Sequence, residues 1–89
     1  MRTSTEREIQ SEGRLLYALL DAADEAGLLA ATTAASWRET KTRILCGTPY
    51  EIEALICHRL LSELVQQGDL SGTWIEARWR TIVARIDSN

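Results

Sequence analysis

The sequence predicts a compact all-α domain of four helices with short loops. Three observations support this class: helix-start signals recur along the chain, glycines stand where helices should stop, and apolar residues recur mainly with helical spacing. With 89 residues and 45% hydrophobic content, the chain suffices for one modest core. We therefore expect residues 1–89 to form a single all-α domain.

Start and stop signals divide the chain into four segments. A Ser or Thr followed three residues later by Glu marks a helix start, because each side chain satisfies a free backbone N–H of the first turn. Four such pairs occur: Thr5 with Glu8, Ser36 with Glu39, Thr48 with Glu51, and Thr73 with Glu76. The first three helices should each end at a glycine that adopts a left-handed conformation: Gly27, Gly47 and Gly68. The predicted helices are about 6–26, 37–46, 49–67 and 74–87.

Two features qualify these boundaries. Gly13 lies inside the first predicted helix and is expected to kink it or to separate its first two turns. The connector GLLAATTAAS, at residues 27–36, consists of small residues and has room for an extra helical turn.

The last segment has two interpretations. The residues Ile75, Trp79, Ile82, Val83 and Ile86 follow helical spacing. Alternating positions are also apolar or β-branched, so a winged helix with a C-terminal β-hairpin is the alternative. A hairpin needs a turn, and residues 73–86 contain no Gly, Pro, Asn or Asp to form one. The helix is therefore favoured.

Composition favours a cytoplasmic protein without membrane contact. The formal net charge is −3, which offers no general attraction to phosphate or anionic lipid. No apolar run is long enough to span a bilayer, and the first ten residues show no signal-peptide core. We expect Cys46 and Cys57 to be reduced, with Cys57 packed as a small apolar residue.

The sequence offers little for catalysis. His58 is the single histidine and is expected on a solvated surface. The set Cys46, Cys57 and His58 lacks the paired spacings of a zinc site, and nucleotide-binding and hydrolase motifs are absent. We therefore predict no enzyme, no metal, no cofactor and no small-molecule substrate.

Surplus apolar and aromatic residues indicate binding to protein. In helix 49–67, Ile52 and Leu55 project away from the main apolar face. This helix is then either central and packed on both sides, or in contact with another chain, a homodimer or a protein partner.

Two edges rich in Trp and basic residues are further candidates. Trp74, Arg78 and Arg85 share one side of the last helix, and Trp and Arg are enriched at binding hot spots. The alternative is that Trp74 covers the preceding loop with Arg78 stacked on its ring. Trp37 and Lys41 form a similar pair, whereas Trp79 is expected in the core.

Helix-turn-helix binding to DNA is the competing function. Helix 37–46, a turn at 46–48 and a longer helix follow in the required order, and residues 37–50 carry a net charge of +2. Against it, Glu51 and Glu53 occupy the start of the recognition helix and would repel phosphate. We therefore expect a non-enzymatic protein-interaction module, an adaptor or inhibitor of a larger assembly, with a DNA-binding transcriptional regulator as the alternative.

Overall fold

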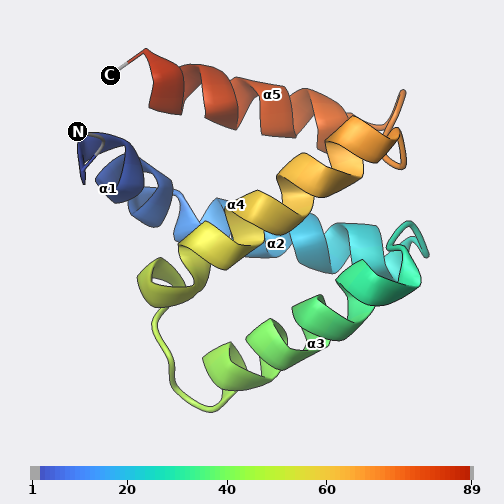
Figure 1. Ribbon diagram of the computed structural model, residues 1–89, viewed down its shortest axis with the longest axis horizontal. Helices are drawn as coiled ribbons and strands as arrows, with labels where there is room; N and C mark the ends of the chain where they lie inside the picture. The colour runs from blue at the N-terminus through green and yellow to red at the C-terminus, as the bar shows by residue number, and fades with distance from the viewer. Residues whose placement is uncertain (1–2, 89) are drawn as a thin grey trace.

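The computed structural model describes residues 3–88, with side chains from residue 5 onward (Figure 1). Its helices are α1 (Thr3–Ser11), α2 (Gly13–Glu25), α3 (Ala31–Leu45), α4 (Tyr50–Gln67) and α5 (Trp74–Asp87). No strand occurs among these residues, so the all-α class is confirmed and the C-terminal β-hairpin is wrong. The count of four helices is also wrong, because the first predicted helix is divided in two.

The division lies at Glu12, and Gly13 explains why it is there. A Cβ atom on Gly13 would lie 2.8 Å from the carbonyl oxygen of Tyr50. Only a residue without a side chain lets the start of α2 approach the backbone at the start of α4 this closely. The separation of the first two turns thus follows from a contact between helices.

The predicted helix stops are confirmed, but only one start signal acts as a cap. Gly27, Gly47 and Gly68 have φ values of 73°, 119° and 83°. At the start of α5, Thr73 Oγ1 accepts from the backbone N–H of Glu76 at 3.3 Å, and the Glu76 carboxylate accepts from Gly72 at 3.3 Å.

The other three capping predictions are wrong. Thr5 and Ser36 lie inside α1 and α3, and the N-cap residue of α4 is Pro49, without a side-chain hydrogen bond. α3 begins at Ala31 rather than near Trp37, because the small residues Thr33 and Ala34 are buried and the helix extends back over them.

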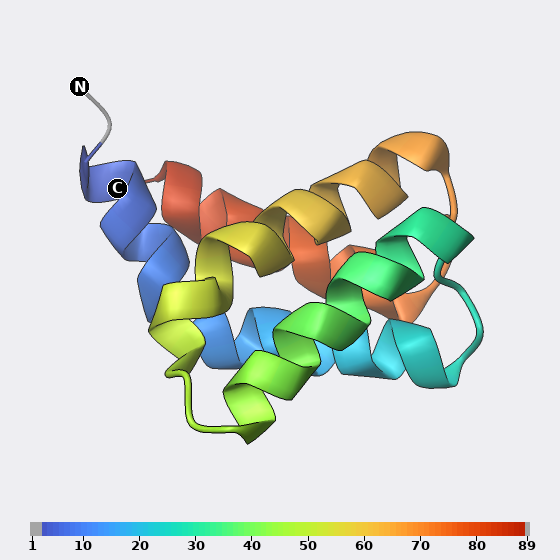
Figure 2. The same cartoon turned by 60° about the horizontal axis from the view of Figure 1, so that its bottom comes forward.

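One core joins the five helices around α4, which packs against α1, α2 and α3. Its fully buried members include Leu16, Leu20, Leu61, Leu64 and Ile82. The molecule is flat, with extents of 34 × 32 × 19 Å. α4 crosses in front of α2 in Figure 1 and lies above it in Figure 2, so α4 forms part of one broad face.

α5 completes the core against α1 and α2. Trp79 is buried, as predicted. None of the described helices combines the length and apolar content needed to cross a membrane.

Candidate interaction surfaces

The Trp74 edge, defined as Trp74 and Arg78, lies at the start of α5. Trp74 is 63% exposed, and Arg78 is exposed one turn further on. Among the described residues Arg78 has no ion pair, and no stacking of its guanidinium on the Trp74 ring is found. An aromatic ring and a cation are thus presented together to solvent, as the sequence predicted.

Arg85 does not extend this edge as predicted. It lies at the far end of α5, where its Nε and Nη2 atoms donate to the Glu12 carboxylate at 3.2 and 2.9 Å. This two-point contact ties α5 to the junction between α1 and α2. Arg85 therefore has a structural partner within the chain.

The predicted exposure of Trp37 is wrong, because this side chain is fully buried. Its ring meets the ring of Tyr17 edge-on, with centroids 5.1 Å apart. The indole Nε1 has no hydrogen-bond partner among the described residues. The buried face of α3 consists of Thr33, Ala34, Trp37 and Thr40. Because only one of these residues is large and apolar, the spacing of apolar residues in the sequence does not identify this face as buried.

Lys41 also makes a contact within the fold. Its Nζ atom lies 2.8 Å from Asp21 Oδ1, which joins α3 to α2. The hydrogen bond to Asp21 raises the pKa of Lys41. The predicted edge of Trp37 and Lys41 is therefore an internal contact between helices.

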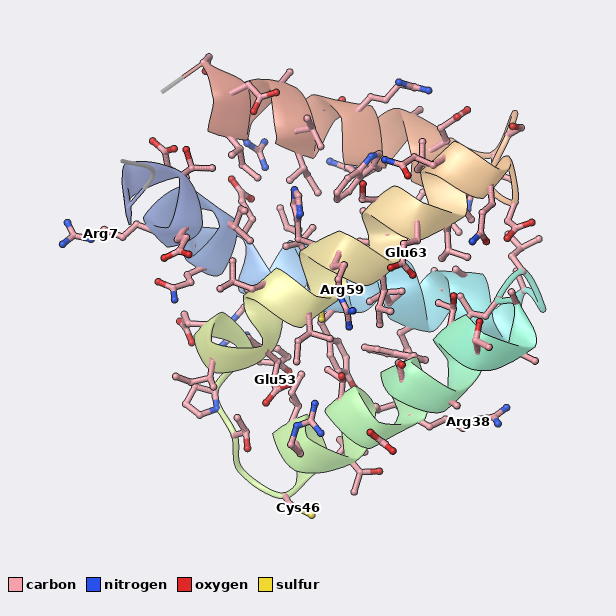
Figure 3. All side chains as sticks on the ribbon, in the orientation of Figure 1. Arg7, Arg38, Cys46, Glu53, Arg59 and Glu63 are labelled. Atoms are coloured by element: carbon pink, nitrogen blue, oxygen red, sulfur yellow. The ribbon has the colours of Figure 1, made fainter. Side chains whose placement is uncertain are left out.

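The corner patch, defined as Leu45, Ile52 and Leu55, lies where α3 ends and α4 begins. These side chains are 71%, 63% and 38% exposed. Ile52 and Leu55 project outward as predicted, although α4 also packs against α1, α2 and α3. Contact of this outward side with another chain stays a prediction. Leu45 was not predicted as a surface residue, because the short helix expected at 37–46 has too few large apolar residues to define its buried side. The free thiol of Cys46 is exposed at the end of α3 (Figure 3).

An ion pair between a buried glutamate and a partly exposed arginine joins α3 to α4 beside this corner. Glu53 is 5% exposed, and its carboxylate accepts from Arg43 Nε at 3.1 Å and Nη2 at 2.9 Å. Arg43 Nη2 also donates to the buried Thr40 hydroxyl at 3.2 Å. Glu53 was expected to repel phosphate at the start of a recognition helix, but it is buried and its charge is compensated by Arg43.

The crossing of α3 and α4 also differs from the one a helix-turn-helix requires. The two helices run nearly antiparallel in both Figure 1 and Figure 2. The helices of a helix-turn-helix instead cross at about 90–120°. The order of elements was predicted correctly, but the geometry is that of an αα-hairpin.

His58 is half-buried rather than solvated. Its ring packs on the ring of Trp79, with centroids 4.9 Å apart, and burial lowers its pKa while Asp87 acts in the opposite direction. The neighbouring Cys57 is buried, and burial raises the pKa of its thiol to about 12, with a smaller contribution from Glu53. Both groups are therefore held in their neutral forms near neutral pH.

No pocket is found in the described part of the molecule, nor any group of three or more His, Cys, Asp or Glu residues placed to hold a metal ion. The two candidate surfaces lie at opposite ends of α4, since the Trp74 edge follows its end and the corner patch surrounds its start (Figure 1). Comparison with family models, curated proteins and solved structures gave no match.

Proposed function

We propose that this chain is a protein-interaction module that uses the Trp74 edge to bind a larger protein as an adaptor or inhibitor. The exposure of Trp74 carries the proposal. The other two tryptophans, Trp37 and Trp79, are buried in the core, so the fold has means to bury such rings. A large exposed ring beside a cation that has no ion pair within residues 3–88 has the composition of a binding hot spot.

The neighbourhood of Trp74 supports this assignment. Thr73 caps α5 and Ile75 is buried, so the helix turn that carries Trp74 is held in place before any partner arrives. A preorganised anchor loses little conformational entropy on binding. The corner patch offers a separate apolar surface for another chain.

Protein binding is favoured over DNA binding by the charges of α3 and α4. Arg43 is paired with Glu53, and Lys41 with Asp21, so two of the cations expected near the turn are already neutralised. The exposed Glu51 remains at the start of α4, where it opposes phosphate.

The test is affinity capture with wild type, Trp74→Ala and Arg78→Ala, alongside Arg38→Ala on α3 as a control. A specific partner should be retained by wild type and the control, and its affinity should fall at least about 30-fold with Trp74→Ala. Equal capture by all four proteins would contradict the proposal. Retention on random-sequence DNA and heparin is measured in the same buffers. Tight, salt-sensitive retention would favour the DNA-binding alternative.

A further inference from the structure

The outward side of α4 carries a symmetric pattern of charges. Glu51, Leu55 and Arg59 follow one another at intervals of four residues, and all three are exposed. The opposite side of the helix is buried by Ala54, Cys57 and Leu61. Figure 3 shows Arg59 and Glu63 on the front of α4, away from α2 behind it.

Glu51 and Arg59 are equidistant from Leu55 and opposite in charge. Each lies about 6 Å from Leu55 along the helix axis, given the rise per residue of an α-helix. Neither has an ion-pair partner among the described residues. Two copies of this helix, packed antiparallel with Leu55 at the two-fold axis, would bring each Glu51 level with Arg59 of the other copy.

The surroundings permit such packing. α4 forms part of a broad face of a flat molecule, so no other helix stands in front of it (Figures 1 and 2). Ile52, 63% exposed, lies beside Leu55 and would lose solvent contact on pairing. Leu45 at the end of α3 adds a further exposed apolar side chain at the rim.

We propose that the chain forms a two-fold symmetric dimer through α4, with Leu55 at the axis and Glu51 of each copy paired with Arg59 of the other. A second copy is the occupant that this pattern selects, because an isologous interface must be complementary to itself. Opposite charges at equal distances on either side of an apolar centre meet that condition. The interface is separate from the Trp74 edge, so the two proposals stand or fall independently.

The charges allow an experiment in which repulsion and attraction are exchanged. The proposed dimer contains two cross-pairs, each joining position 51 of one copy to position 59 of the other. Glu51→Arg alone would make both cross-pairs Arg with Arg, and Arg59→Glu alone would make both Glu with Glu. Each variant should dimerise at least about tenfold more weakly than wild type, because two attractive pairs become two repulsive ones. An equimolar mixture of the two variants should form a heterodimer, since both cross-pairs are then Arg with Glu.

The measurement is sedimentation equilibrium over a concentration series, with circular dichroism to show that each variant is folded. Arg38→Glu on α3, which reverses the charge of an exposed arginine outside α4, is the matched control and should dimerise like wild type. Recovery of dimer in the mixture, and in the double variant Glu51→Arg with Arg59→Glu, supports the proposal. A wild-type monomer at every concentration overturns it. A dimer that is indifferent to the single changes, or one that the mixture fails to restore, overturns the α4 pairing.

Discussion

Glu53, buried near the start of α4, accepts two hydrogen bonds from Arg43 near the end of α3. The pair fixes the two helices of the αα-hairpin at the end where the connecting loop lies. A carboxylate this buried depends on its partner, because its own hydration has been lost.

Arg43→Ala should therefore destabilise the domain more than Arg38→Ala, which removes an exposed arginine of the same helix that has no ion pair among the described residues. Urea unfolding followed by circular dichroism gives the comparison. The double variant Arg43→Ala with Glu53→Ala should be less destabilised than the two single effects added together, because the unpaired charge is gone. Equal midpoints for Arg43→Ala and Arg38→Ala would contradict this role.

Gly13→Ala tests the close approach of α2 to α4. Helix propensity alone predicts that Ala at a helical position stabilises, by about 0.5–1 kcal/mol. The 2.8 Å contact with the Tyr50 carbonyl predicts the opposite sign, a loss of about 1–3 kcal/mol in the free energy of unfolding. Because the obstructing atom belongs to the backbone, a side-chain rotation cannot relieve it. Chemical denaturation decides the sign, and a stabilised variant would refute the contact.

Trp37 and Trp74, one from each of the two edges predicted from the sequence, should respond to truncation by very different amounts. Trp37→Ala removes a fully buried ring and should lower the free energy of unfolding by about 3–5 kcal/mol. Trp74→Ala should change it by less than about 1 kcal/mol, because the ring is largely in water. Thermal and urea unfolding measure both. A large loss with Trp74→Ala would mean that this ring is structural.

His58 makes stability depend on pH in a defined direction. Burial lowers the pKa of His58 in the folded state below its ordinary value of 6.5, so the unfolded chain binds a proton first as pH falls. The contribution of His58 is fully present above about 6.5 and is lost as pH falls through the folded-state pKa.

Replacing His58 by Gln should flatten this part of the stability profile. Urea unfolding of wild type and His58→Gln at a series of pH values on both sides of 6.5 provides the comparison. Parallel profiles for the two proteins would show that another group is responsible.

The sequence predicts elements better than contacts here, and particular residues show why. Gly68 and Thr73 act over a single turn, so local patterns identified the boundary between α4 and α5 correctly. Gly13, in contrast, owes its role to the Tyr50 backbone, 37 positions later in the chain. Trp37 was wrongly predicted to be exposed, because the small residues that share its buried face carry little hydrophobic signal.

The candidate surface residues also differ in how well the sequence predicted them. Trp74, Ile52 and Leu55 stand off the main apolar stripes of their helices, and projection alone placed them outside the core. Lys41, Arg43 and Arg85 looked alike in the sequence as basic side chains on helix surfaces. Their acidic partners come from distant parts of the chain, so only the assembled fold distinguishes them from Arg78, which has no ion pair among the described residues.

The bridge between Arg85 and Glu12 has a consequence for how the domain comes apart. It joins residues 73 positions apart in the chain, and Ile9 and Ile86 beside it are both buried. The last helix thus packs against the first helix. Because α1 and α5 pack against each other, hydrogen exchange should find the two helices opening together in one cooperative step.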